Sequence, residues 1–176
     1  DRAAGYKEND SMGGYDPYSS SKGCAELVTS SYRRSFLQDQ GIGLASVRAG
    51  NVIGGGDWAD DRLIPDILKS FENGSSVIVR NPQATRPWQH VLEPLSGYLV
   101  LVQKLYQNPK EYAEGWNFGP NEQDVKPVDW ILDKMIAKWP NSSWELDISS
   151  SPHEAGFLKL DISKAKSKLG WNPLWS

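Results

Sequence analysis

Apolar and polar positions follow two different periods along this chain, and segments of the two kinds take turns. Over 127–139, apolar residues recur every three or four positions, the spacing of an amphipathic helix. Over 77–80, Val-Ile-Val-Arg is a short β-branched run typical of a strand. By these criteria the sequence predicts helices over 18–40, 63–71, 93–106, 127–139 and 163–170, and strands over 42–49, 77–80, 88–91, 116–118, 144–147 and 157–160. Because helices and strands alternate, the predicted fold class is α/β.

The helix predicted over 18–40 has a local signal at each end. Asp16 is a favourable N-cap residue, and Pro17 suits the first helical position. Gly41 stands where glycine most often ends a helix. The segments 1–17 and 50–58 are rich in glycine and polar residues, and we expect both to be loops.

This helix carries the first candidate chemistry. If it begins after Asp16, Tyr18 and Lys22 lie one turn apart on the same face. An ammonium close to a phenol favours the phenolate, and a phenolate can take a proton from an alcohol or sugar hydroxyl. The pair therefore predicts a dehydrogenase-type site, and the alternative is an ordinary pair on an exposed helix surface.

The same spacing occurs a second time, at Tyr106 and Lys110. Asn108 and Pro109 lie between these two residues, and the residue before a proline avoids helical geometry. We therefore expect Tyr106 to lie near the end of one helix and Lys110 beyond it. This second pair is interpreted as structural.

Composition and charge narrow the class of protein. With 19 Lys and Arg against 22 Asp and Glu the net charge is −3, which gives no basic face for nucleic acid. The longest apolar runs are about five residues, far below the roughly 20 that span a membrane. The single cysteine, Cys24, fits a reducing cytoplasm, and its apolar neighbours predict that it is buried. Two histidines far apart and one cysteine predict no metal site.

One expected part of a nucleotide-binding fold is missing from this sequence. The Gly-x-Gly-x-x-Gly turn that holds a dinucleotide pyrophosphate does not occur, and neither do the first strands of a doubly wound sheet. The run Gly54-Gly55-Gly56 follows a strand, but Asp57 comes next and would repel phosphate. That run is either a flexible turn or a loop at a substrate site. We expect the chain to be a piece of a longer protein.

Three longer strings carry a family resemblance that the Tyr18 and Lys22 pair alone does not. They are GNVIGGGDWA at 50–59, RPWQHVLEPL at 86–95 and PHEA at 152–155. Together with the Tyr-x-x-x-Lys helix and the strand after it, they resemble the extended short-chain dehydrogenase/reductase family of nucleotide-sugar enzymes. Within that family they are similar to the 4,6-dehydratases that act on CDP-glucose.

The resemblance implies a fold and a division of the chain. It implies the C-terminal part of an NAD-binding Rossmann-type fold plus a smaller α+β substrate-binding domain, with the N-terminal strands missing from this chain. Residues 1–50 would end the Rossmann domain with the Tyr-x-x-x-Lys helix and a parallel strand. The remaining segments would be substrate domain over 51–85, a strand and helix returning to the Rossmann domain over 86–114, and substrate-binding domain over 115–176.

The resemblance also implies a lyase activity with NAD as cofactor. CDP-D-glucose would be oxidised at C4, lose water across C5 and C6, and receive the hydride back at C6, giving CDP-4-dehydro-6-deoxy-D-glucose. Tyr18 and Lys22 would be catalytic, and both would contact NAD together with Arg48. The residues that would bind the substrate are Asn51, Arg62, Arg80, Arg86 and His153.

Several of these implied roles have alternatives. Asn51 could instead stabilise a turn, and Arg86 could form a surface salt bridge. Many relatives have an arginine where this sequence has His153 and Glu154, so a structural role is an equal alternative there. The acid–base residues for the elimination would precede Asp1, and the isolated chain is expected to be inactive.

The resemblance further implies a cytoplasmic homodimer paired through the helices at 18–40 and 93–106, whose product feeds the O-antigen sugars of lipopolysaccharide. Two other functions stay open at this stage. One is a nucleotide-sugar epimerase or decarboxylase of the same family, because Tyr18 and Lys22 serve all of these reactions equally. The other is a non-catalytic module that binds a sugar nucleotide without NAD.

Overall fold

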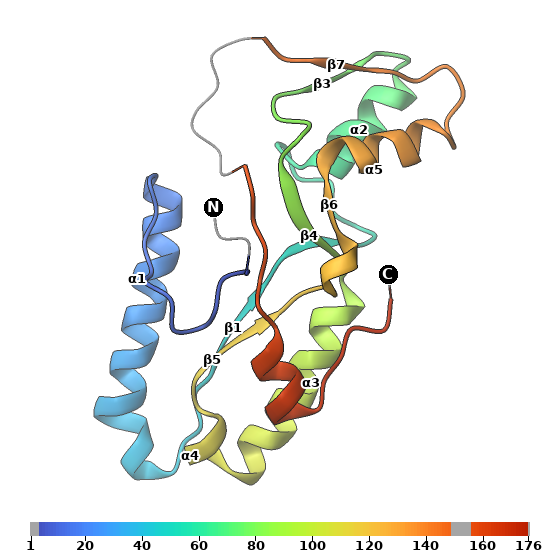
Figure 1. Ribbon diagram of the computed structural model, residues 1–176. Coiled ribbons are helices and arrows are strands. Elements are labelled where there is room, and N and C mark those ends of the chain that lie inside the picture. The colour runs from blue at the N-terminus through green and yellow to red at the C-terminus, as the bar shows by residue number, and fades with distance from the viewer. Residues whose placement is uncertain (1–3, 149–155, 176) are drawn as a thin grey trace.

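The computed structural model describes residues 4–148 and 156–175 (Figure 1). Its α-helices are α1 (Pro17–Tyr32), α2 (Leu63–Glu72), α3 (Leu92–Gln107), α4 (Pro109–Tyr112) and α5 (Val128–Ile136). Its shorter helical turns are η1 (Arg33–Leu37, π-helical), η2 (Gln38–Gln40), η3 (Glu122–Asp124) and η4 (Ala165–Leu169, π-helical). Its strands are β1 (Ser46–Ala49), β2 (Asn51–Ile53), β3 (Val77–Val79), β4 (Thr85–His90), β5 (Gly115–Phe118), β6 (Val125–Pro127) and β7 (Trp144–Leu146).

The strands form small sheets in which parallel pairing predominates. β1 pairs with β5 and β3 pairs with β7, both in parallel. β4 is the middle strand of the third sheet, parallel to β2 and antiparallel to β6. Parallel pairs joined through helices are the pattern of an α/β protein, so the predicted fold class is confirmed.

Two apolar clusters stabilise the two ends of the molecule. The first cluster joins α2, β3 and α5, and its buried members are Ile67, Phe71, Val77, Val79, Ala84, Val128 and Leu132. The second joins α3, β5 and η4, and its buried members are Leu101, Trp116, Phe118, Ile162, Ala165, Leu169 and Trp171. Figure 1 shows α2 and α5 at one end, α1 and α3 at the other, and β4 running between the two.

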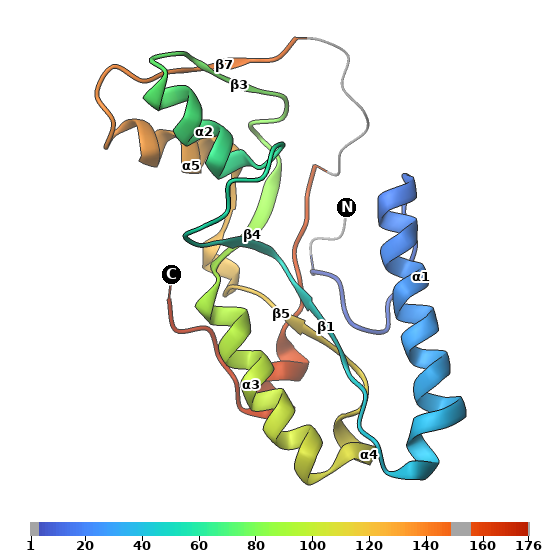
Figure 2. The same ribbon diagram turned by 180° about the vertical axis from the view of Figure 1, so that it is seen from behind.

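The helices α1 and α3 flank the β1–β5 pair, which lies between them in both views (Figures 1 and 2). On the α3 side the packing is close, since a Cβ at Gly97 would clash with the ring of Phe118. The C-terminal segment is also tied to α3. The buried carboxylate of Glu93 accepts hydrogen bonds from the backbone N–H groups of Leu174 and Trp175, and the Trp171 indole donates to Ser96.

Most of the predicted elements are confirmed, including the helix that begins at Pro17. The helical path continues to Gln40 and ends at Gly41, whose φ of 71° is left-handed. It is not a uniform α-helix, however, because it changes to a π-helical turn after Tyr32. The predicted break between Tyr106 and Lys110 is confirmed, since α3 ends at Gln107 and α4 begins anew at Pro109.

Three expectations are wrong. The segment 50–58 is not all loop, because Asn51–Ile53 pairs with β4 as strand β2. No strand forms over 157–160, where Phe157 and Leu160 each make only an isolated bridge. Cys24 is exposed rather than buried, because α1 has no buried residue in the described chain. Among the described residues, no helix has the length and apolar character needed to cross a membrane.

Candidate functional site

The start of α1 places the Tyr18 and Lys22 side chains. Asp16 caps the helix: its carboxylate accepts the backbone N–H of Ser19 at 2.9 Å and the Ser19 hydroxyl at 2.5 Å. These hydrogen bonds lower the pKa of the Asp16 carboxyl, so it stays charged next to the helix N-terminus. Tyr18 therefore belongs to a first turn whose position is fixed by its cap.

Tyr18 and Lys22 meet one turn apart, as their spacing predicts. The Lys22 ammonium lies 5.4 Å from the centre of the Tyr18 ring. The Tyr18 side chain is 69 % exposed. Within residues 4–148 and 156–175, neither the Tyr18 hydroxyl nor the Lys22 ammonium makes a hydrogen bond or ion pair. Both groups are thus available to a ligand.

Both side chains line a cleft of about 670 Å³ between α1, the N-terminal loop and β1. From α1 it is lined by Tyr18, Ser19, Lys22, Gly23, Ala25, Glu26 and Thr29. From β1 it is lined by Ser46, Val47, Arg48 and Ala49, and from the loop by Tyr6, Lys7, Asp10, Ser11, Met12 and Gly13. The predicted catalytic pair therefore faces an open space that runs along the whole of strand β1.

Arg48 shares this cleft, but two of its donors are already used inside the protein. Its Nε donates to Glu26 at 2.7 Å, and its Nη1 donates to the backbone carbonyl of Glu8 at 3.2 Å. The second oxygen of Glu26 accepts the Ser46 hydroxyl at 2.6 Å. The Arg48 hydrogen bond lowers the pKa of the Glu26 carboxyl, burial opposes the effect, and the Ser46 hydrogen bond adds to it.

Four of the residues predicted to bind the sugar nucleotide lie in the described part of the chain, and none of these four lines the cleft. Asn51 is half-buried in β2, opposite Trp88 of β4. Arg86 is buried in β4, and its guanidinium donates to the Thr85 carbonyl at 3.0 Å. Arg62 precedes α2 and Arg80 follows β3, both exposed. His153 and Glu154 lie outside the described residues.

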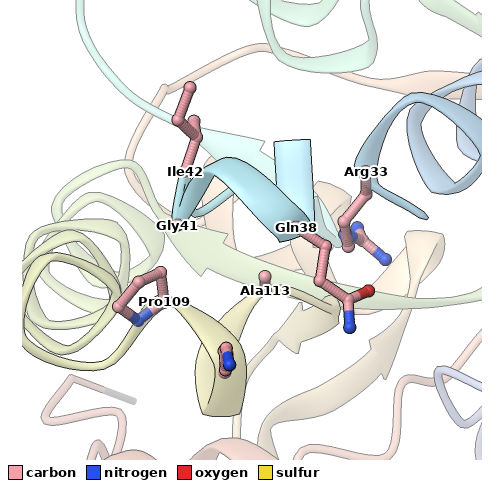
Figure 3. A pocket seen from close by; sticks show the side chains of 7 residues that line it. Arg33, Gln38, Gly41, Ile42, Pro109 and Ala113 are labelled. Atoms are coloured by element: carbon pink, nitrogen blue, oxygen red, sulfur yellow. The ribbon is translucent and has the colours of Figure 1, made fainter. Parts of the chain in front are cut away.

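A second, smaller pocket of about 60 Å³ lies where η1 and η2 meet α4 (Figure 3). Its lining includes Arg33, Gly41 and Pro109 but none of the predicted site residues. The Arg33 Nε donates to the Leu44 carbonyl at 2.6 Å, so this arginine ties the end of α1 to the segment before β1. The pocket belongs to that connection and not to the Tyr18 cleft.

Sequence reasoning missed Glu26 and Ser46, which complete the contact between α1 and β1. One signal was present: Glu26 follows Lys22 by four residues and so shares its helix face. It also missed Asn117, a buried residue whose amide donates to the carbonyls of Tyr6 and Asp161. In the described part of the chain, no cluster of three His, Cys, Asp or Glu residues is arranged to hold a metal ion.

Comparison with known proteins agrees with the resemblance noted in the sequence. The sequence profile of the GDP-mannose 4,6-dehydratase family matches residues 2–176. A CDP-glucose 4,6-dehydratase of Salmonella typhimurium is 63% identical over 97% of this chain. The match covers 49% of that protein, so the chain spans about half the length of this curated relative.

Solved structures show the same fold at much lower identity. A dTDP-glucose 4,6-dehydratase of Bacillus anthracis, in complex with NAD, superposes with a TM-score of 0.80 at 19% identity, over 100% of this chain and 53% of that one. A dTDP-glucose 4,6-dehydratase of Streptomyces venezuelae gives 0.77 at 18% identity, over 99% and 51%. A UDP-N-acetylglucosamine 4-epimerase of Methanobrevibacter ruminantium gives 0.79 at 17% identity, over 99% and 53%.

Proposed function

The chain belongs to the GDP-mannose 4,6-dehydratase family, and from this premise we propose that it is the C-terminal half of an NAD-dependent CDP-D-glucose 4,6-dehydratase. The full-length enzyme would convert CDP-D-glucose to CDP-4-dehydro-6-deoxy-D-glucose. The observation that carries the proposal is the 63% identity to a CDP-glucose 4,6-dehydratase over 97% of this chain. The geometry agrees with it, since Tyr18 and Lys22 meet at the edge of a cleft.

NAD is the cofactor that this proposal requires, and Lys22 could bind its nicotinamide end. Lys22 offers three N–H donors without a hydrogen-bonding partner in the described chain, which suits the two hydroxyls of a nicotinamide ribose. Arg48 lines the same cleft, but its charge is already paired with that of Glu26. NAD supplies the capacity to accept a hydride from C4 of the sugar and to return it to C6.

Within this reaction, Tyr18 would remove the proton of the sugar C4 hydroxyl. Tyr18 is largely exposed and lines the cleft, so a sugar C4 hydroxyl bound there can approach the Tyr18 hydroxyl. As the general base, Tyr18 would accept the proton of that hydroxyl, which allows the C4 carbon to be oxidised to a ketone. Lys22, whose ammonium lies 5.4 Å from the centre of the Tyr18 ring, would orient the ribose by its hydrogen bonds.

The ketone at C4 acidifies the hydrogen at C5, which makes loss of water across C5 and C6 possible. That elimination needs an acid–base pair, which we assign to the half of the enzyme outside this chain. For the diphosphate of CDP-glucose, Arg86 is the best candidate, because a guanidinium can bind phosphate oxygens through two hydrogen bonds. Asn51, Arg62, Arg80 and His153 are further candidates for substrate contacts.

We also propose a cytoplasmic homodimer whose product enters O-antigen synthesis. The homodimer is supported by apolar side chains that are exposed on two helices. They are Leu27 and Val28 on α1, and Leu95, Leu99 and Val102 on α3. Exposed patches of this kind mark protein interfaces. A second copy of the enzyme would cover them, and Leu27→Asp in the full-length enzyme should halve the mass measured by light scattering.

Turnover of purified protein tests the proposal. The full-length enzyme incubated with CDP-glucose and NAD+ should give the 4-keto product, whereas the 176-residue chain alone should give none. An epimerised CDP-sugar without the ketone would instead show that the enzyme is a nucleotide-sugar epimerase. A 4-epimerase is among the solved structures with the same fold. A chain that binds CDP-glucose but not NAD would support the non-catalytic alternative.

A further inference from the structure

One face of α1 carries both the candidate catalytic pair and the attachments of the helix. At about 100° per residue, positions 18, 22, 26, 29 and 33 fall within an arc of about 80°. Tyr18, Lys22, Glu26 and Thr29 line the cleft, and Arg33 continues the same face at the end of the helix. The direction in which Tyr18 and Lys22 point therefore depends on whatever holds Glu26 and Arg33.

Within the described part of this chain, Glu26 and Arg33 are not held by apolar packing of α1. In the described chain α1 has no buried residue and contributes none to either apolar cluster. A helix attached by an apolar stripe has its rotation set by the shape of the core, but α1 has no such stripe buried here. Within this chain, the side-chain contacts that fix its rotation about its own axis are polar.

Glu26 supplies the most specific of these contacts. Its two oxygens accept the Ser46 hydroxyl at 2.6 Å and the Arg48 Nε at 2.7 Å. Ser46 and Arg48 are two residues apart in β1, so both side chains leave the same face of the strand. The side chains of Glu26 and Arg48 are only 17% and 24% exposed, which protects the ion pair from water. A carboxylate held at both oxygens has little freedom to turn.

Arg33 makes a second attachment on the same helix face. Its Nε donates to the Leu44 carbonyl at 2.6 Å. Positions 26 and 33 are about 10 Å apart along the helix axis at 1.5 Å per residue. Two contacts at this separation fix the tilt of α1 as well as its rotation.

We propose that Glu26 is a positioning residue, whose bonds to Ser46 and Arg48 hold α1 in the rotation that turns Tyr18 and Lys22 toward the cleft. This inference rests on the proposed function of that pair. The required accuracy is high: a rotation of about 15° moves a side chain 6 Å from the helix axis by about 1.5 Å. A misplacement of about 1 Å is enough to cost on the order of 10²-fold in rate.

The first test uses the 176-residue chain and needs no activity. Amide hydrogen exchange is compared between the unsubstituted chain, Glu26→Gln and a matched control, Glu114→Gln. Glu114 is also a half-buried, ion-paired glutamate, but its carboxylate pairs with Lys164 and Lys168. Its backbone carbonyl, which accepts the Ser46 N–H of β1, is kept in the glutamine variant. We expect exchange over 18–32 to rise at least about fivefold in Glu26→Gln and to stay unchanged in Glu114→Gln. Equal protection of α1 in all three proteins would overturn the inference.

The second test uses the full-length enzyme and separates positioning from folding. For Glu26→Gln we expect kcat to fall about 10- to 100-fold while KM for CDP-glucose changes less than about threefold and bound NAD per protein is unchanged. A loss of kcat matched by an equal loss of bound NAD would show a folding defect and contradict positioning. If the unsubstituted enzyme fails to dehydrate CDP-glucose, the proposed function fails, and the exchange experiment still decides how Glu26 holds α1.

Discussion

The two helices that flank the β1–β5 pair are held in opposite ways. α3 buries Glu93, Pro94, Gly97 and Leu101, and its apolar contacts join the cluster around Trp116 and Phe118. α1 has the same length of 16 residues, but in the described chain it buries none of them. Its links to the β1 side are hydrogen bonds and an ion pair, made by Glu26 and Arg33. One face of the sheet is packed with apolar side chains, and the other borders an open cleft.

The contrast between the two helices places apolar packing at α3 and the candidate catalytic residues at α1. Burial of apolar area stabilises α3, and such burial needs no particular charge. Polar contacts at α1 leave space beside the helix, so that Tyr18 and Lys22 remain exposed to a ligand. We therefore expect substitutions on the α1 side and on the α3 side to differ in their effects on activity, on the free energy of unfolding and on its pH dependence.

The largest effect should come from removing the Tyr18 hydroxyl. In the full-length enzyme, Tyr18→Phe should lower kcat by about 10³-fold, the scale of a lost general base. The matched control is Tyr106→Phe, which changes the second Tyr-x-x-x-Lys pair, on the α3 side. Tyr106 is 90% exposed and α3 ends before Lys110, so this variant should keep full activity. Comparable losses in both variants would contradict the assignment of the chemistry to α1.

Next in size is the apolar contact of α3. Leu101 is 2% exposed, and Leu101→Ala should lower the free energy of unfolding of the chain by about 3 kcal/mol, a typical value for a buried leucine. Leu27→Ala on α1 removes the same atoms from a side chain that is 63% exposed, and it should cost less than about 0.5 kcal/mol. Urea unfolding of the two variants measures the contrast directly. Equal losses would mean that α1 is packed more tightly than its exposure indicates.

A third effect concerns the C-terminal segment on the α3 side. Glu93 accepts backbone N–H groups at both oxygens, so Glu93→Gln places an amide donor against one of those N–H groups. Loss of a buried acceptor should cost about 1–3 kcal/mol in the free energy of unfolding. Glu122→Gln is the control, because Glu122 is an exposed residue paired with Lys159 and its loss should have no measurable effect. A similar result for both would show that the Glu93 contacts do not hold the C-terminal segment.

The parts of the fold that local signals encode could be predicted from the sequence. Asp16, Pro17 and Gly41 mark the ends of the first helical segment by properties of single residues, and the structure agrees with all three. Strand β2 was missed because it has only three residues between two glycines. Its partner β4 lies more than 30 residues further along the chain.

The contacts around the candidate site could be predicted only in part, for a related reason. The Tyr18 and Lys22 pair is local, so its geometry follows from the helix. The contacts of Glu26 cross 20 and 22 residues to reach Ser46 and Arg48, and a single sequence does not state which strand packs beside which helix. Cys24 was misjudged for the same cause, since its burial depends on what covers the outer face of α1.

The smallest expected effect is a dependence on pH of the stability that Glu26 contributes to the attachment of α1. The Arg48 hydrogen bond holds the pKa of Glu26 below its usual value of 4.5, the value expected in the unfolded chain. A carboxyl whose pKa is lower in the folded state stabilises the fold fully above the unfolded pKa, and the contribution is lost as pH falls through the folded pKa. Glu26→Gln lacks this ionisation, so it should cost about 1 kcal/mol at neutral pH and progressively less below about pH 4.5.

Urea unfolding of both proteins between neutral pH and about pH 3 measures how the difference shrinks. Leu101→Ala gives the comparison from the α3 side, because an apolar contact has no proton to bind and its cost should stay constant over the same range. A Glu26→Gln penalty that is equally constant would show that the charge of Glu26 contributes nothing. The attachment of α1 would then resemble that of α3 more than the hydrogen bonds to Ser46 and Arg48 indicate.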